Sequence, residues 1–265
     1  MDPDPVIIGG APRSGVRLLA SVLDGHPELA SGPELSFIIT LARQWQDIHT
    51  TLGENHARNY GLPPEQTREN FRSLALQILM SRARAAGKRQ FVLHSFAASL
   101  SLDSLAALFS NSRFVLMVRD PRDVVHSLLQ CDWRNPRDNL RLPYTQDAAA
   151  AAKLWNDFTD ITVRRAPALE AQRRAILVRY EDLCLRAPET LDRLGRFLGI
   201  GGIVPAVNAA SAMAVVETLG SPHPELRAGI IGKDSVGLGR RDLSAADLAA
   251  VESATVTLRQ HLGYR

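Results

Sequence analysis

The clearest indication of the fold comes from residues 6–27, VIIGGAPRSGVRLLASVLDGHP. Residues 6–8 are apolar and lead into Gly9 and Gly10, which is typical of a buried strand that runs into a glycine-rich turn. Apolar residues then recur at helical spacing over residues 16–23, until DGHP breaks the pattern. The sequence therefore predicts a strand, a turn and a helix in direct succession.

The rest of the chain repeats this alternation. Three further short apolar runs predict strands at residues 91–94, 114–118 and 175–178. Helical patterns lie between and after them, at residues 68–86, 102–109, 147–165, 189–198 and 245–262. Strands that alternate with helices favour a P-loop-like, three-layer α/β domain, in which helices flank a mainly parallel central sheet. Ligands of such sheets bind at the carboxyl ends of the strands.

Length and composition indicate an ordinary globular protein. No linker divides residues 1–265, so we expect one domain. The formal charge of +3 and the pI of about 9.1 favour anionic ligands without requiring nucleic acid, and we expect no nucleic-acid partner. The two cysteines, Cys131 and Cys184, lie in no metal-binding motif, and we expect no metal.

Location and assembly are predicted less directly. No apolar run approaches the ~20 residues that a membrane-spanning helix needs. Residues 1–5 carry two acids and two prolines where a signal peptide needs a basic start. We therefore expect a cytoplasmic protein without a membrane partner. The sequence leaves the oligomeric state open, a homodimer included.

The first motif is the turn from Gly10 to Gly15, in which four residues separate two glycines between a strand and a helix. Backbone N–H groups and the helix N-terminus make such a turn a site for phosphate or sulfate. An ATP or GTP site would need Lys and then Ser or Thr after the second glycine, but Val16 and Arg17 stand there. An anion held by Arg13 and its neighbours without a metal fits better, and a plain structural turn is the alternative.

The second motif follows the strand at 114–118. Arg119 comes at the strand end and Ser127 lies eight residues on, so the two could close on one anion from two sides. The alternatives are an ion pair of Arg119 with Asp120 or Asp123 and an ordinary helical role for Ser127. His126 is expected to be packed or solvated.

Together these segments resemble the sulfotransferase superfamily, most closely the tyrosylprotein sulfotransferases and their bacterial relatives. The resemblance rests on PRSG…LL…LDGHPELASGPE (12–34), LFSNSRFVLMVRDPRDVVHS (108–127) and ILVRYEDL (176–183), which occur in the family's order. It implies the sulfotransferase fold and transfer of a sulfuryl group from 3′-phosphoadenosine 5′-phosphosulfate (PAPS) to an acceptor hydroxyl.

The resemblance also implies which residues bind the donor. Around its 5′ end it places Arg13, Ser14, Gly15, Val16 and Arg17. The 3′-phosphate would be held by Arg119 and Ser127, and Tyr180 would approach the donor. A late glycine-rich loop suggests Lys233 as a further contact.

Glu34 occupies the place of the family's glutamate general base. The alternative is that Glu34 is an acidic residue in the first turn of a helix, where it interacts with the helix dipole. His94 stands where the tyrosylprotein group has a catalytic lysine. It could donate a proton to the leaving phosphate or act as a second base. The alternative is that His94 is an ordinary histidine of the core. Val16 and Arg17 replace the family's usual Thr Thr, so Arg17 either restores those contacts or points into solvent.

Several functions stay open at this point. Peptide or protein tyrosine is the preferred acceptor, and the hydroxyl of a small molecule, a sugar or a lipid is the alternative. A P-loop kinase or NTPase would use Asp120 as its magnesium ligand. A protein that binds the nucleotide but has lost the chemistry is the third candidate.

Overall fold

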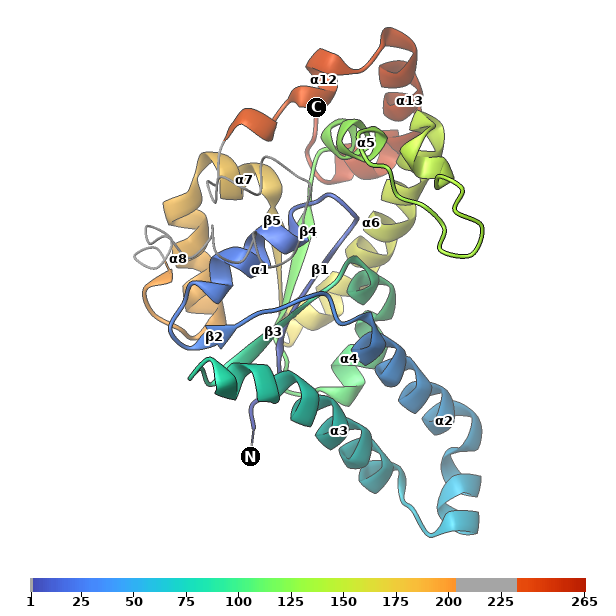
Figure 1. The fold of residues 1–265 in the computed structure, drawn as a ribbon, viewed down its shortest axis with the longest axis vertical. Helices are drawn as coiled ribbons and strands as arrows, with labels where there is room; N and C mark the ends of the chain where they lie inside the picture. Colours follow the sequence, from blue (N-terminus) through green and yellow to red (C-terminus); the bar gives the residue numbers. More distant parts are fainter. Residues whose placement is uncertain (1, 204–232) are drawn as a thin grey trace.

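The structure is a computed structural model that describes residues 2–203 and 233–265. Its elements, in chain order, are β1 (Val6–Gly10), α1 (Val16–Asp24), β2 (Leu29–Ala30), α2 (Ser36–Tyr60), α3 (Pro64–Ala85), β3 (Gln90–His94), η1 (Phe96–Ser101), α4 (Leu102–Leu108), β4 (Phe114–Val118), α5 (Pro121–Leu129), η2 (Pro143–Thr145), α6 (Ala148–Ala171), β5 (Ala175–Arg179), α7 (Tyr180–Leu185), α8 (Ala187–Leu198), η3 (Lys233–Ser235), α12 (Leu238–Asp242) and α13 (Ala245–His261). The η elements are short 3₁₀ helices. Strands alternate with helices as the sequence predicts (Figure 1).

The strands form one parallel sheet in the order β2-β3-β1-β4-β5. Strand β1 pairs with β3 on one side and with β4 on the other. The crossover connections before and after β3 therefore run to opposite sides of β1. Such a switch point opens a crevice at the carboxyl ends of the strands. The glycine turn after β1 therefore lies between the ends of β3 and β4.

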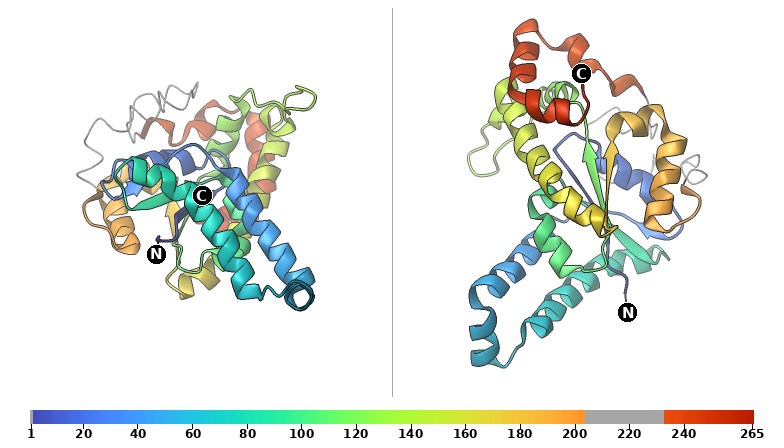
Figure 2. Two further views of the ribbon diagram at one scale, coloured as in Figure 1. Left: turned by 60° about the horizontal axis from the view of Figure 1, so that its bottom comes forward. Right: turned by 180° about the vertical axis from the view of Figure 1, so that it is seen from behind.

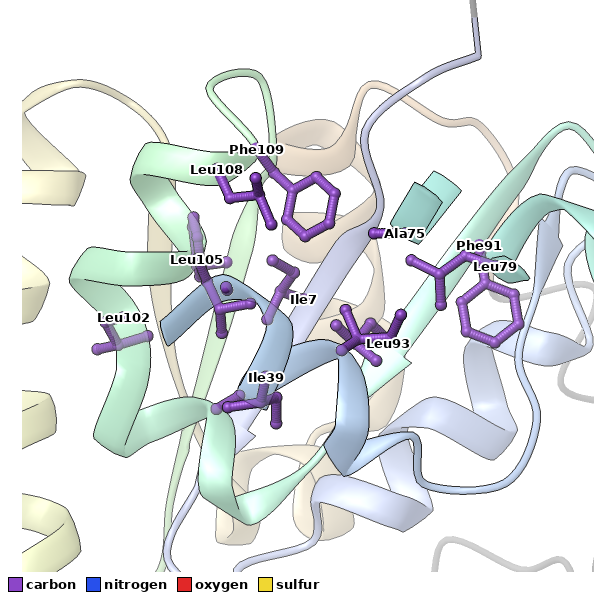
Figure 3. Close-up of a cluster of buried hydrophobic side chains, with 14 of the residues drawn as sticks. Ile7, Ile39, Ala75, Leu79, Phe91, Leu93, Leu102, Leu105, Leu108 and Phe109 are labelled. Carbon is purple, nitrogen blue, oxygen red and sulfur yellow. The ribbon is translucent and has the colours of Figure 1, made fainter. Parts of the chain in front are cut away.

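Both faces of the sheet are covered, because side chains alternate along each strand. Ile7 packs with α2, α3 and α4 in one cluster, in which Phe91 and Leu105 also lie (Figure 3). Ile8 faces the other way and packs with α1 and α8. The predicted three-layer α/β fold is thus confirmed.

Helix α2 is much longer than the sequence pattern indicates. Residues 35–42 show a helical pattern, but α2 runs to Tyr60 and pairs with α3 to form an antiparallel arm that extends beyond the sheet (Figures 1 and 2). Its early residues, such as Ile38 and Trp45, are buried, whereas the described side chains after Trp45 are exposed or half-buried. A helix that packs over only part of its length carries little apolar periodicity.

The strand β2 has no counterpart in the prediction, because two residues are too few to make an apolar run. The terminal helix α13 packs against α5 and α6 through Val251, which is buried beside Trp155. The indole N–H of Trp155 donates to the carbonyl of Arg119 (3.0 Å). Helix α6 thereby fixes the chain where it leaves β4.

Candidate active site

The glycine turn forms a tight loop at the start of α1. Arg13 and Gly15 both adopt positive φ, 68° and 91°, and the N–H of Ser14 donates to the carbonyl of Ala11 (3.1 Å). The hydroxyl oxygen of Ser14 is fully buried and has no hydrogen-bond partner among the described residues. An unsatisfied buried hydroxyl at a helix N-terminus is a donor available to an anion.

The structure brings the two sequence motifs into contact. The Nε of Arg13 donates to Ser127 Oγ (2.8 Å), and one Nη of Arg119 donates to the carbonyl of Arg13 (2.9 Å). The other Nη of Arg119 donates to the carbonyl of Ser235 (2.7 Å), while its Nε is buried without a described partner. The two motifs therefore form one polar cluster above the ends of β1 and β4.

The charged residues of the second motif have different partners in the structure. Within residues 2–203 and 233–265, Arg119 makes no ion pair with Asp120 or Asp123. Asp120 instead accepts from the guanidinium of Arg122, with an oxygen–nitrogen separation of 2.6 Å. His126 lies 3.8 Å from the carboxylate of Asp242 on the half-buried side of α5.

Tyr180 is buried beneath this cluster. The guanidinium carbon of Arg119 lies 4.1 Å from the centre of its ring, and its hydroxyl is 2.5 Å from Ser235 Oγ. Burial raises the pKa of Tyr180 to about 12, so the phenol stays protonated near neutral pH. The ring also sets the space above Gly15, where an added Cβ would lie 2.5 Å from Tyr180 Cδ2.

Gly15→Ala should destabilise the protein. The positive φ alone costs alanine about 1–3 kcal/mol, and the contact of the methyl group with the Tyr180 ring adds to this. Gly53→Ala in α2 is the matched control, since a Cβ added there would have no atom within 4 Å. There alanine should stabilise by up to about 1 kcal/mol. Urea denaturation of both variants checks the pair, and equal effects would contradict it.

Glu34 lies just before α2, at the end of the sheet where β3 stops. It accepts a hydrogen bond from the hydroxyl of Ser95, the first residue after β3. The same Ser95 oxygen accepts the N–H of Ala97 (3.1 Å). Since an N–H only donates, the single hydroxyl proton of Ser95 is free to point at Glu34.

His94 ends β3 and is 4% exposed. Its Nδ1 lies 3.3 Å from the hydroxyl of Ser31, which also donates to the carbonyl of Val92 (3.3 Å). Burial first, and the charge of Arg17 second, lower the pKa of His94 to about 4. The imidazole is therefore neutral near pH 7.

The remaining residues that were predicted to contact the donor lie in different environments. Val16 is buried in the core, so its side chain faces away from the loop surface. Arg17 is exposed, and its charge acts on His94. Lys233 begins η3, and its side chain lies outside the described residues.

No sequence motif assigned Ser95 to this region. Asp123 was expected only as a possible ion-pair partner of Arg119, and in the late glycine-rich loop Lys233 rather than Ser235 was expected to contact the donor. Ser95 follows the predicted strand end directly, so its position was a usable signal. Asp123 and Ser235 are brought in by a contact between α5 and the loop before α12, across more than one hundred residues. No local pattern marks such a contact.

Within residues 2–203 and 233–265, no group of three or more His, Cys, Asp or Glu side chains could hold a metal ion. In the same part of the chain, the helices are all too short or too polar to cross a membrane.

Comparison with solved structures supports the fold. The sulfotransferase domain from the Synechococcus PCC 7002 olefin synthase superposes with a TM-score of 0.65 at 23% identity, covering 100% of this chain and 96% of that one. The sulfotransferase domain from the curacin biosynthetic pathway gives a TM-score of 0.60 at 20% identity, covering 99% and 98%.

Sequence comparison leads to the same family. Protein-tyrosine sulfotransferase 1 of Danio rerio is 29% identical over 211 residues, which is 74% of this chain and 53% of the relative. Protein-tyrosine sulfotransferase A of Caenorhabditis elegans is 27% identical over 202 residues, 74% of this chain and 50% of the relative. The chain thus spans about half the length of these two relatives. The model of the sulfotransferase family matches residues 5–202. The resemblance seen in the motifs is confirmed, and the chain belongs to the sulfotransferase family.

Proposed function

We propose that the protein transfers a sulfuryl group from PAPS to an acceptor hydroxyl, with peptide or protein tyrosine as the first choice of acceptor. The observation that carries the proposal is the cluster at the ends of β1 and β4. It combines a glycine turn, two arginines and two buried donors without described partners, Ser14 Oγ and Arg119 Nε. Relatives named protein-tyrosine sulfotransferases support the choice of tyrosine.

The residues present fit a donor that carries two anionic groups. Arg13, Ser14 and the N–H groups of the turn would hold the 5′-phosphosulfate. Arg119 and Ser127 would hold the 3′-phosphate, with Tyr180 packed against Arg119. When bound, PAPS supplies the sulfuryl group and a phosphate leaving group.

A kinase-like mechanism fits the same residues less well. Val16 and Arg17 stand where a magnesium-dependent site has Lys and a hydroxyl residue. Asp120, the residue proposed for magnesium in that case, caps α5 and is bonded to the guanidinium of Arg122. Its carboxylate is therefore engaged within the protein.

The roles of Glu34 and Ser95 follow from their hydrogen bond. Glu34 takes the proton of the acceptor hydroxyl as general base. Ser95 orients that carboxylate by donating to one of its oxygens, which leaves the second oxygen for the acceptor. Arg13 and the backbone donors of the turn stabilise negative charge on the leaving side.

We assign His94 the role of a second base or hydrogen-bond acceptor rather than that of a proton donor. If the hydroxyl proton of Ser31 points at the carbonyl of Val92, Nδ1 of His94 is the donor to Ser31 and Nε2 carries the lone pair. The low pKa of His94 agrees with this neutral form.

The buried His94 should make stability depend on pH. Because its pKa falls from 6.5 to about 4 on folding, the unfolded chain binds a proton between these values that the folded chain does not. The contribution of neutral His94 to stability is therefore fully present above pH 6.5 and is lost as the pH falls toward 4. Wild type should lose up to ~3 kcal/mol more than His94→Gln between pH 7 and 4. Urea denaturation at both values checks this, and parallel losses would contradict it.

The function itself is tested by transfer of the ³⁵S-labelled sulfuryl group from PAPS in the presence of a metal chelator. The acceptors are an acidic tyrosine peptide, the same peptide with phenylalanine in place of tyrosine, a simple phenol and a sugar. Label on the tyrosine peptide alone supports the full proposal. Label on the phenol or sugar alone keeps the sulfotransferase reaction and overturns the tyrosine acceptor. Binding of PAPS without transfer to any acceptor supports the inactive alternative.

A further inference from the structure

Asp123 is a buried acid that the proposed reaction does not use. It lies in the first turn of α5, is 2% exposed and forms no ion pair among the described residues. Its two carboxylate oxygens accept backbone N–H groups from Gly237 and Gly239, each at 2.8 Å. A buried carboxylate is costly unless it is well hydrogen-bonded, so both of these bonds matter.

The two glycines belong to a segment, residues 234–239, that we call the clamp loop. Gly239 packs so closely on α5 that an added Cβ would lie 2.2 Å from the carbonyl carbon of Arg122. Gly237 takes a positive φ of 83° at the start of α12. The loop is thus shaped to bring two amides onto one carboxylate.

The clamp loop also contacts the proposed donor site. Two residues before Gly237, Ser235 accepts from Arg119 through its carbonyl (2.7 Å) and contacts the hydroxyl of Tyr180 through its side chain (2.5 Å). Asp123 and Ser127 lie one helical turn apart on the same face of α5. One helix face therefore carries both the loop anchor and a proposed phosphate ligand.

We infer that Asp123 is a positioning residue that holds the clamp loop against α5, so that Ser235 and Arg119 form the 3′-phosphate side of the donor site. This inference rests on the proposed function. Asp123 is not itself a donor ligand, because its negative charge would repel a phosphate. It acts through the amides that it accepts.

The test compares binding of adenosine 3′,5′-bisphosphate by calorimetry in wild type, Asp123→Asn and Gly239→Ala. Asparagine keeps one acceptor oxygen but turns an NH₂ group toward the second amide, and alanine forces the loop off α5. Each should weaken binding by about tenfold or more. Asp157→Asn, an exposed acid on α6, is the matched control and should bind as wild type does.

Kinetics and hydrogen exchange separate positioning from a loss of general structure. In Asp123→Asn the KM for PAPS should rise about tenfold. The KM for the acceptor and the kcat at saturating PAPS should stay within about twofold, and the amides of Gly237 and Gly239 should exchange faster.

The outcomes are distinct. If wild type binds the bisphosphate and both variants bind it equally well, the inference is wrong while the proposed function stands. If wild type does not bind it, the proposed function fails and the inference fails with it. If Asp123→Asn changes kcat and both KM values together, Asp123 has a general structural role and the inference is also wrong.

Discussion

Glu34→Gln should lower kcat by about 10²–10⁴-fold, because a general base that takes a proton in the transition state contributes about that much. The amide is nearly the same size and can still accept from Ser95, so the local structure should persist. It has no proton affinity suited to the reaction. The measurement is steady-state transfer from PAPS to the best acceptor, together with calorimetric binding of adenosine 3′,5′-bisphosphate.

The control for this variant is Glu65→Gln, which removes an exposed acid from the first turn of α3. It should leave both kcat and bisphosphate affinity unchanged. Glu34→Gln should also leave the affinity unchanged, since Glu34 is assigned to the acceptor side. Normal turnover in Glu34→Gln would show that another group takes the proton, and His94 would be the next residue to test.

Arg119→Ala should lose donor affinity before anything else. Removing a buried charged donor from an anion site costs about 2–5 kcal/mol, which is roughly 30- to 4,000-fold in affinity. Arg119→Lys should recover only part of the loss, because an ammonium group lacks the planar fork that reaches two carbonyls and stacks on Tyr180. Calorimetric titration of the three proteins with the bisphosphate measures this order.

A loss of folding has to be separated from a loss of binding in these variants. Arg119 bonds to two backbone carbonyls, so its removal should also lower the melting temperature of the free protein. Arg137→Ala, at an exposed position outside the elements named above, is the control. Equal affinity in Arg119→Ala and Arg137→Ala would remove Arg119 from the donor site.

The fold was predictable because its inner strands β1, β3 and β4 are buried on both faces. The runs at 91–94 and 114–118 are apolar almost throughout, which is what a central parallel strand requires, and both appear in the sheet. The short β2 and the outer part of α2 were not predictable in the same way. Neither has an apolar pattern, since one is too short and the other packs over only part of its length.

The site was predictable where its residues follow strand ends. The glycine turn after β1, His94 at the end of β3 and Arg119 after β4 meet because parallel strands end at one edge of the sheet. The contacts that Asp123 and Ser235 make escaped prediction, since they join segments far apart in sequence. The hydrogen bond between Ser95 and Glu34 depends on how two loops pack, which local patterns do not encode.

The cluster around Arg119 and the glycine turn is proposed to bind an adenosine bisphosphate. The most direct measurement is a thermal shift with adenosine 3′,5′-bisphosphate, compared with ADP in the presence and absence of magnesium. A ligand that binds only the folded state raises the melting temperature by mass action. We expect the bisphosphate to stabilise the protein independently of magnesium, and we expect this stabilisation to be lost in Arg119→Ala. Stabilisation by ADP with magnesium, and none by the bisphosphate, would contradict this expectation and favour phosphoryl transfer.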